Sequence, residues 1–561
     1  RDRRSLPKGT EYFFSDLHGE YDAFSGLLRS ASGVIREKID AVFGKSVSAH
    51  DRDELAALIY RSEACIKART TAGQLTDEWR RLTLYRLILV SQAVGAKYTR
   101  QAVREKMPEG YAYILDELLN VTDDINRDFY YDEIISSILE TGVADSFITA
   151  MCTLIRRLTV DWLHIIGDIY DRGPRADRIM DELVAHARVD IQWGNHDISW
   201  MGAAAGCPAL VANVIRIALS YNSYDVLEDG YGLNLRPLSV FATEVYGDDP
   251  CTHFLPHTLD DVVFDHVDAL LTARMHKAIA VIQCKLEGGL LRAHPEYGMD
   301  ERRLFERCDF RRGVVRLGGR EYALSDTHFP TVDPDDPLAL TDGERELMAV
   351  LVSSFHHSVR LNEHIRFLYA HGGMYKVANG NLLYHGCIPV NGDGSFRSVR
   401  VPFCAGEKAG RELLDAIERV VRRAYFLPYN TPEQIESRDY VWYLWCGPDS
   451  PLYGKDKMAF FERTFVCDAP CTENYGAYYR ITEHGGEDTG DPEAARRLCD
   501  RILTAFGLDP AKGHIINGHV PVLLKEGQSP VRAGGRLFVI DGGISKAYRS
   551  KTGIAGYTLI Y

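Results

Sequence analysis

Short apolar segments that end in polar, glycine-containing loops recur along this chain and limit how it can fold. Residues 11–15 (EYFFS) run into Asp16 and His18, residues 162–166 (WLHII) run into Asp168, and residues 189–193 (VDIQW) run into Asn195. Aromatic and β-branched segments of this length, stopped by glycine and polar residues, are typical of buried β-strands. Open α/β sheets bind ligands outside the carboxyl ends of such strands, so the pattern predicts an α/β fold with one polar site there.

The same pattern returns in the second half of the chain. Residues 365–370 (IRFLYA) precede His371, residues 514–518 (HIING) precede His519, and residues 537–540 (LFVI) end at Asp541. We expect strands at these three places as well. His371 and His519 should then join the side chains that the first half contributes.

The intervals between these segments are too long for simple strand crossovers. His18 and Asp168 are 150 positions apart, and the sequence between them has leucine and isoleucine at helical spacing among charged residues. A second, mainly helical stretch surrounds a loop rich in aspartate and proline at 333–337. The predicted organisation is 1–30 and 160–200 as the first half of a catalytic core, 31–159 and 201–360 as helical insertions, and 361–561 as the second half of the core.

Composition and charge exclude several classes of function. A net charge of -14 opposes general nucleic-acid binding, which depends on cations that face phosphates. No apolar stretch approaches the roughly 18 residues that a membrane helix needs. The basic residues 1–8 have no apolar segment behind them and so resemble neither a signal peptide nor a transit peptide. We expect a cytoplasmic protein with reduced cysteines and with neither nucleic acid nor membrane as a partner.

The polar residues at the predicted strand ends match what two-metal hydrolysis of a phosphate ester requires. Two cations roughly 3.5 to 4 Å apart must share a bridging ligand and contact the phosphoryl oxygens. A carboxylate suits the bridge because it has two oxygens and a negative charge. The candidate ligands are carboxylates, an amide and imidazoles: Asp16, His18, Asp168, Asn195, His371 and His519. This nitrogen and oxygen set suits Mn, Fe, Zn or Co better than Ca.

One such motif alone is a weak signal. Asp326 and His328 have the spacing of Asp16 and His18 and also follow a strand-like segment at 321–324. The specific feature is the ordered set, in which Asp-x-His is followed by Gly-Asp-x-x-Asp-Arg-Gly at 167–173 and by Gly-Asn-His-Asp at 194–197.

This ordered set resembles the calcineurin-like metallophosphoesterase superfamily, in particular the branch shared with phosphoprotein phosphatases. The resemblance implies a core of two β-sheets packed face to face, flanked by helices, with the metals at the sheet ends. It also implies the ligands of each ion: Asp16, His18 and Asp168 for one metal, and Asp168, Asn195, His371 and His519 for the other. His196 would be the general acid, oriented by Asp171, and Arg172 would hold the phosphate.

These implied roles make chemical sense. Two cations make hydroxide available near neutral pH and stabilise charge on the attacked phosphoryl group. An alkoxide leaves poorly, so a protonated His196 beside it contributes a factor of roughly 10² to 10⁴. The carboxylate of Asp171 favours the imidazolium, and the planar guanidinium of Arg172 matches phosphate oxygens.

Further segments narrow the resemblance to class III fructose-1,6-bisphosphatase over essentially the whole chain. They are residues 6–10 (LPKGT), 382–390 (LLYHGCIPV), 444–455 (LWCGPDSPLYGK) and 541–548 (DGGISKAY). The resemblance implies a bacterial hydrolase of gluconeogenesis that removes the 1-phosphate of fructose 1,6-bisphosphate, with manganese as the metal. Family members continue beyond both ends of this chain, so we expect a trimmed sequence.

A sugar bisphosphate needs cations for its non-reacting phosphate, and Lys455, Arg463 and Lys546 are the candidates. Two other functions stay open: a serine/threonine protein phosphatase with an open groove, and a non-catalytic metal-binding regulatory protein. The long insertions favour an enclosed site, and every position for metal, acid and phosphate is filled. A homo-oligomer is expected for a metabolic enzyme of this size.

Overall fold

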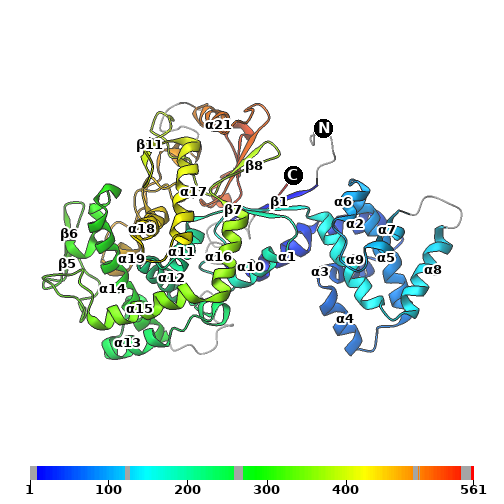
Figure 1. Cartoon of the computed structure of the whole chain (residues 1–561), viewed down its shortest axis with the longest axis horizontal. Helices are drawn as coiled ribbons and strands as arrows, with labels where there is room; N and C mark the ends of the chain where they lie inside the picture. Colours follow the sequence, from blue (N-terminus) through cyan, green and yellow to red (C-terminus); the bar gives the residue numbers. More distant parts are fainter. Residues whose placement is uncertain are drawn as a thin grey trace.

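The computed structural model describes residues 9–120, 127–257, 269–483, 491, 493–541, 543–544 and 557–561. Lys546 lies outside the described residues, so its role stays a prediction. Within these ranges the chain has a mixed α/β structure with two five-stranded sheets at its centre (Figure 1). No helix in this part of the chain is both long enough and apolar enough to cross a membrane.

The first sheet contains the three strands predicted in the first half of the chain. Its order is β15 (Leu559–Ile560), β1 (Glu11–Phe14), β2 (Trp162–Ile165), β3 (Val189–Gln192) and β7 (Gly372–Gly373). Strands β1, β2, β3 and β7 run parallel, and β15 is antiparallel to β1. The parallel order brings the carboxyl ends of β1, β2 and β3 to one edge of the sheet.

The second sheet is formed by later parts of the chain. Its order is β13 (Val531–Arg532), β14 (Leu537–Val539), β12 (His514–Asn517), β9 (Asn381–Leu383) and β8 (Lys376–Ala378). The three central strands are parallel, and the two edge strands are antiparallel to their neighbours. The strands predicted before His519 and Asp541 are therefore confirmed.

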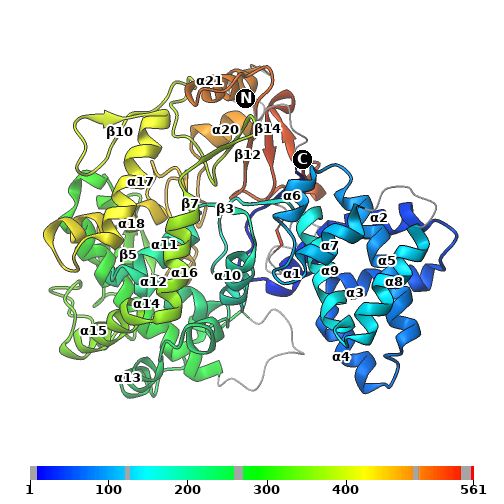
Figure 2. The ribbon, with the colours of Figure 1, turned by 45° about the vertical axis from the view of Figure 1, so that its right-hand side comes forward.

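The two sheets pack against each other through a small apolar layer. Phe13 of β1 and Ile166 after β2 belong to one buried cluster with Leu383 and Ile516 of the second sheet and with Ile540, which follows β14. Burying each of these side chains stabilises the fold by roughly 1.5–3 kcal/mol. In Figure 2 strands β12 and β14 lie beside the first sheet. This packing brings the ends of β9 and β12 to the ends of β1, β2 and β3.

The residues between β1 and β2 are helical, as predicted. After α1 (Tyr21–Arg29) come α2 (Val34–Phe43), α3 (Ala49–Tyr60), α4 (Ser62–Thr71), α5 (Asp77–Gly95), α6 (Arg100–Arg104), α7 (Ala112–Leu119), α8 (Arg127–Glu140) and α9 (Ala144–Thr159). Ser48, Thr76 and Thr99 cap α3, α5 and α6, because each hydroxyl accepts a hydrogen bond from a backbone N–H three residues on. Helices α2 to α9 form a separate lobe to one side of the sheets (Figure 1), named the helical lobe below.

Residues after β3 are mainly helical as well. They form α11 (Asn195–Ala204), α12 (Pro208–Ser220), α13 (Arg236–Tyr246), α14 (Ala269–Ala293) and α15 (Asp342–His357), with a small sheet of β4 (Cys308–Asp309), β5 (Val314–Leu317) and β6 (Arg320–Ala323). The remaining elements are α10 (Ala176–Ala185), α16 (Val359–His371), α17 (Gly410–Phe426), α18 (Pro432–Cys446), α19 (Phe460–Phe465), α20 (Ala477–Glu483), α21 (Ala494–Ala505), and the strand pair β10 (Val399–Arg400) and β11 (Glu407–Lys408). Helix α11 is buried along its whole length, as expected of an interior helix that is apolar on most sides.

The strand predicted at residues 365–370 is wrong, because this segment is the last part of α16. Ile365, Leu368 and Tyr369 are buried and lie three and four positions apart, which places them on one helix face. Arg366, which lies between them in the sequence, is exposed. The apolar residues of this segment thus follow the helical repeat, although a short apolar segment of this kind is also typical of a buried strand.

Candidate metal and catalytic site

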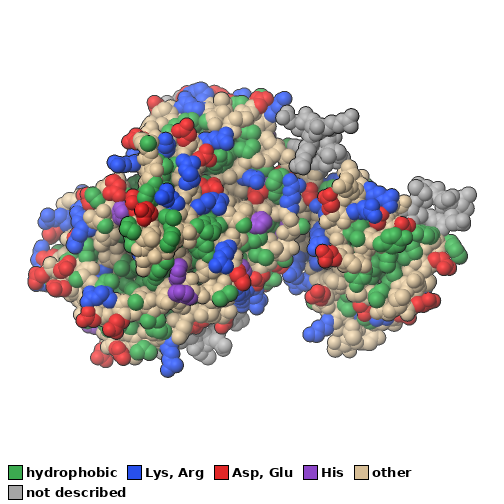
Figure 3. Space-filling model, viewed as in Figure 1, with side chains coloured by type: hydrophobic (Ala, Val, Ile, Leu, Met, Phe, Trp, Pro, Cys, Tyr) green, Lys and Arg blue, Asp and Glu red, His purple; other side chains and the backbone are tan. Residues whose placement is uncertain are grey.

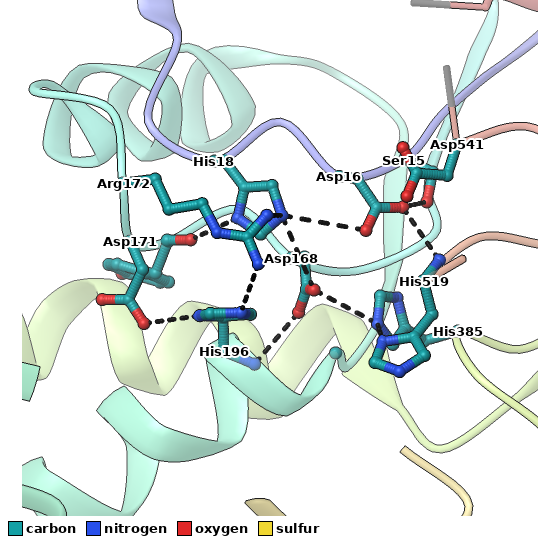
Figure 4. A network of polar contacts seen from close by, with 12 residues as sticks. Ser15, Asp16, His18, Asp168, Asp171, Arg172, His196, His385, His519 and Asp541 are labelled. Carbon is teal, nitrogen blue, oxygen red and sulfur yellow. Dashed lines mark hydrogen bonds and ion pairs between the residues drawn. The ribbon is translucent and has the colours of Figure 1, made fainter. Parts of the chain in front are cut away.

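Polar loops from both sheets meet at one edge of the core (Figure 4). Asp16 and His18 follow β1, Asp168 follows β2, and Asn195 follows β3 as the first residue of α11. His385 and His519 arrive from the second sheet, after β9 and β12. All of these residues are buried except His519, which is partly exposed.

These loops hold six of the predicted site residues in the left-handed backbone region. The φ angles are 54° for Asp16, 44° for His18, 57° for Asp168, 68° for Asp171, 70° for Arg172 and 71° for His519. Residues with a side chain rarely adopt this conformation, and each instance costs about 1–3 kcal/mol. Such strain persists where the surrounding structure fixes it, and it concentrates at functional sites.

Glycines let the carboxylates approach the neighbouring loops. A Cβ on Gly194 would lie 2.1 Å from Asp168 Oδ1, and one on Gly518 would lie 2.5 Å from Asp16 Oδ2. Neither distance is compatible with a side chain. The glycines before Asn195 and His519 are therefore needed for the close approach of the two carboxylates.

Three histidines are oriented in the same way around Asp168. Each donates a ring N–H to a backbone carbonyl: His18 Nδ1 to Tyr170 (3.0 Å), His385 Nδ1 to Ile166 (2.7 Å) and His519 Nε2 to Tyr453 (3.0 Å). The other ring nitrogens face the centre of the site. His18 Nε2 lies 3.9 Å from Asp168 Oδ2, and His385 Nε2 lies 3.3 Å from the same oxygen. Metal-ligating imidazoles are typically held by such a hydrogen bond on the far ring nitrogen.

Asp168 belongs to two groups of potential metal ligands. One group adds His18 and His196 and the other adds His385 and His519, and in each group the ligand atoms lie within 4.8 Å of one another. Asp168 Oδ1 also accepts the backbone N–H of His196 at 3.0 Å. A carboxylate shared by two groups of nitrogen ligands fits the bridging position of a two-metal site.

The site places several carboxylates in a small buried volume. Burial, together with the repulsion of Asp168, raises the pKa of Asp16 to about 6 although His385 lies nearby. Burial and the charge of Asp16 raise the pKa of Asp541 well above its usual range. Burial would lower the pKa of His385, but Asp168 and Asp16 outweigh it and raise that pKa to about 10. Divalent cations would offset this repulsion, so the residues fit a metal site.

Asn195 and Asp197 complete the loop after β3. Asn195 Oδ1 is buried and has no hydrogen-bond partner among the described residues, an arrangement that costs roughly 1–3 kcal/mol unless a ligand meets the oxygen. Asp197 accepts hydrogen bonds from the backbone N–H groups of Asp168 (2.8 Å), Ile169 (2.8 Å) and Gly194 (2.9 Å). Asp197 thus fixes the loops after β2 and β3 to each other.

The predicted catalytic residues lie together beside these ligands. His196 Nδ1 donates to Asp171 Oδ2 at 2.7 Å, and Trp200 Nε1 donates to Asp171 Oδ1, also at 2.7 Å. Arg172 donates to His18 Nε2 at 2.9 Å and to His196 Nε2 at 3.4 Å. The arrangement places an imidazole and a guanidinium on the same side of Asp168 (Figure 4).

The structure does not bring His371 to this cluster. His371 is exposed, ends α16 and stacks on Phe367 with ring centroids 4.3 Å apart. It precedes β7, which runs parallel to β3, so it lies at the amino end of its strand, whereas the other candidate ligands lie at carboxyl ends. His385 is the histidine that the structure places beside Asp168 and His519.

Sequence reasoning missed His385, Trp200 and Asp541 as members of the site. The apolar segment 381–383 followed by Tyr-His-Gly is the signal that could have identified His385. No local pattern connects Trp200 with Asp171. Asp541 follows a strand that was predicted, and its carboxylate lies beside Ser15 and Asp16 in Figure 4.

Two of the three candidate substrate cations, Lys455 and Arg463, lie within the described residues, and their surroundings differ. Lys455 Nζ lies 3.4 Å from Glu473 Oε2, and burial lowers the pKa of Lys455, with Glu473 opposing this shift and Arg172 adding to it. Arg463 is half exposed and donates to the other oxygen of Glu473 at 2.5 Å. Lys455 is near Arg172, whereas Arg463 faces solvent. Asp326 and His328, which have the same spacing as Asp16 and His18, lie outside this site. Asp326 contacts Lys277, and His328 contacts Asp249.

Comparison with known proteins identifies the family. Residues 3–561 match a family model described as Firmicute fructose-1,6-bisphosphatase. The chain is 49%, 48% and 47% identical to the fructose-1,6-bisphosphatase class 3 proteins of Bacteroides fragilis, Clostridium tetani and Parabacteroides distasonis, and each match covers 99% of this chain and 82% of the relative. No solved structure matches the chain. The chain belongs to the class 3 fructose-1,6-bisphosphatase family.

Proposed function

We propose that this chain hydrolyses fructose 1,6-bisphosphate to fructose 6-phosphate and inorganic phosphate with two divalent metal ions, as a cytoplasmic bacterial enzyme of gluconeogenesis. The observation that best supports this is the arrangement around Asp168, where three imidazoles each bond a backbone carbonyl and turn the other nitrogen inward. The relatives named fructose-1,6-bisphosphatase class 3 support the substrate.

The core fold that we propose is that of the calcineurin-like metallophosphoesterases. Two sheets that share an apolar interface, with polar loops gathered at their strand ends, support this assignment. The helical lobe and the helices after β3 would then be insertions into that core. A homo-oligomer is part of the proposal only on grounds of size.

The metal ligands would be divided between two positions. One metal would be held by Asp16, His18 and Asp168, and the other by Asp168, Asn195, His385 and His519. His385 replaces His371 because only His385 lies in the cluster. Nitrogen and oxygen ligands of this kind suit Mn²⁺. Two such ions supply hydroxide near neutral pH and positive charge beside the phosphoryl oxygens.

The protein's own residues would then complete the reaction. His196 would give the proton on Nε2 to the departing sugar oxygen, while Asp171 holds Nδ1. Arg172 would donate to phosphoryl oxygens with the Nη atoms that now contact His18 and His196. Lys455 would bind the non-reacting phosphate, because it is a mostly buried cation on the side of Arg172.

Release of phosphate from fructose 1,6-bisphosphate in the presence of Mn²⁺ tests the proposal. A phosphopeptide and a dinucleoside polyphosphate are the competing substrates, and His196→Ala is the control. Turnover of the sugar bisphosphate that is lost in the variant is the expected result. Preference for the phosphopeptide would instead assign a protein phosphatase, and no turnover with any metal would leave a metal-binding regulatory protein.

A further inference from the structure

A cleft of about 500 Å³ lies where the helical lobe meets the core. One wall comes from the turn between α3 and α4 and from α9, and the other wall comes from α1 and α10. Figure 3 shows the molecule narrowing at this junction, with basic side chains gathered there. The cleft is called the lobe cleft below.

The lobe cleft is separate from the metal cluster. Helix α1 begins three residues after His18, and its last two residues, Leu28 and Arg29, line the cleft. A helix of this length spans about 13 Å. Helix α10 likewise begins near the Asp168 loop and reaches the cleft at Glu182 and Ala185. The cleft therefore lies at the carboxyl ends of α1 and α10, two helices that begin beside the loops that carry His18 and Asp168.

Four guanidinium groups line the lobe cleft, and three of them have no acidic partner among the described residues. Arg29 pairs with Glu182. No carboxylate among the described residues lies within 4.0 Å of Arg61, Arg156 or Arg157, by the distances that define the ion pairs of this chain. Such guanidiniums provide planar donor groups for an anion.

The contacts of these arginines are with neutral groups. Arg156 Nη1 donates to the carbonyls of Ile59 (3.0 Å) and Tyr60 (3.2 Å), and Arg157 Nη1 donates to the carbonyl of Lys106 (3.2 Å). Burial lowers the pKa of Arg156, and the nearby Glu182 and Glu63 only partly oppose this shift. An anion in the cleft would compensate the charge of Arg156.

The acidic residues of the lobe cleft do not cancel this charge. Guanidiniums outnumber carboxylates by four to two, the carboxylates being Glu63 and Glu182. Glu182 Oε1 accepts from Arg29 Nε (3.1 Å) and Ser25 Oγ (2.9 Å). Glu182 Oε2 is buried and has no hydrogen-bond partner among the described residues, so it can accept one from a hydroxyl group.

We propose that the lobe cleft is a second ligand site that binds a small hydroxylated organic phosphate. Arg61, Arg156 and Arg157 bind the phosphate group, and Glu182 accepts a hydrogen bond from a hydroxyl of the same ligand. The apolar part of the wall, at Leu28 and Val160, contacts the carbon skeleton. This inference does not rest on the catalytic proposal, because it concerns binding alone.

Isothermal titration calorimetry with 2-hydroxyethylphosphonate tests the site, since a phosphatase cannot hydrolyse its carbon–phosphorus bond. The titration uses the full chain with its metals and, in parallel, Asp168→Asn, which alters the metal cluster and leaves the lobe cleft intact. We expect saturable binding in both proteins. Arg61→Ala and Arg157→Gln should each weaken it about tenfold, as expected for loss of one charge-assisted contact.

The matched control is Arg81→Ala on α5, because Arg81 does not line the cleft and should leave the affinity unchanged. Ethylphosphonate should bind more weakly than 2-hydroxyethylphosphonate, and equal affinities would overturn the role of Glu182. Unchanged affinity in Arg61→Ala and Arg157→Gln would overturn the site itself. Binding that disappears only in Asp168→Asn would assign the phosphonate to the metal cluster. If Arg157→Gln does not fold, the exposed Arg61→Ala decides.

Discussion

His196 Nδ1 lies 2.7 Å from Asp171 Oδ2, and this pair joins the start of α11 to the loop after β2. The other oxygen of Asp171 accepts Trp200 Nε1 at 2.7 Å, so the carboxylate is held on both sides. In this geometry the carboxylate of Asp171 accepts a hydrogen bond from the N–H at His196 Nδ1. The pair therefore fixes the orientation of the imidazole ring and keeps a proton on His196 Nδ1.

We expect Asp171→Asn to lower kcat for fructose 1,6-bisphosphate by roughly 10²- to 10⁴-fold. The amide oxygen would face Trp200, and the amide NH₂ would face His196 Nδ1 and disfavour the imidazolium. The loss should be much smaller with p-nitrophenyl phosphate, whose leaving group needs little protonation. Steady-state kinetics with both substrates checks this, and equal losses would contradict a role in protonating the leaving group.

The replacement of His371 by His385 in the proposed ligand set leads to a second prediction, which concerns metal content. We expect His385→Ala to weaken manganese binding by at least about tenfold, whereas His371→Ala should leave it unchanged. The reason is that His385 Nε2 faces Asp168 at 3.3 Å, while His371 is exposed at the end of α16. Metal analysis after dialysis against a series of Mn²⁺ concentrations measures both variants. The opposite order would restore His371 as the ligand.

A third prediction separates substrate binding from chemistry at Lys455. We expect Lys455→Ala to raise KM for fructose 1,6-bisphosphate about tenfold, which is the usual effect of losing one charge-assisted contact, and to leave KM for p-nitrophenyl phosphate unchanged. Lys457→Ala is the matched control, because Lys457 is occupied by Glu462 and the carbonyl of Pro470, at 3.4 and 3.3 Å. If KM for both substrates rises in parallel, Lys455 acts on the metal site and not on the second phosphate.

A fourth prediction concerns stability and pH at His294, far along the chain from the metal loops. Its Nε2 lies 3.1 Å from Asp439 and its Nδ1 lies 2.8 Å from Glu296. These carboxylates, Asp439 first, raise the pKa of His294 from 6.5 to about 9. Because the folded-state pKa is the higher one, protonation stabilises the fold fully below pH 6.5, and this contribution is lost as the pH rises through about 9.

We therefore expect His294→Gln to reduce the free energy of unfolding by on the order of 1–2 kcal/mol at pH 6 and by progressively less towards pH 9. Chemical denaturation at several pH values measures the difference. His50→Gln serves as the control, since the His50 side chain is 81% exposed and its Nε2 lies 3.7 Å from Glu54 Oε1, a long contact in solvent. A difference between wild type and His294→Gln that does not change with pH would show that the residue acts only through packing.

Most of the site was readable from the sequence because its chemistry is local. Asp16, His18, Asp168 and Asn195 each lie within four residues of the end of a strand, and parallel strands bring their carboxyl ends together without any further information. Gly194 and Gly518 in the neighbouring loops leave room for the carboxylates of Asp168 and Asp16 to approach the backbone closely. The sequence alone therefore predicted the α/β core, the helices between its strands and the types of polar residue that gather at the strand ends.

Only the tertiary structure decided between His371 and His385, because both follow apolar residues and precede glycine. The choice depends on whether residues 365–370 pack by one helical face and on which end of a parallel strand each histidine occupies. The contact of Trp200 with Asp171 and the arginines of the lobe cleft likewise join residues from separate elements. Such contacts arise when helices and sheets pack, and packing depends on the shapes of surfaces that no local pattern of residues records.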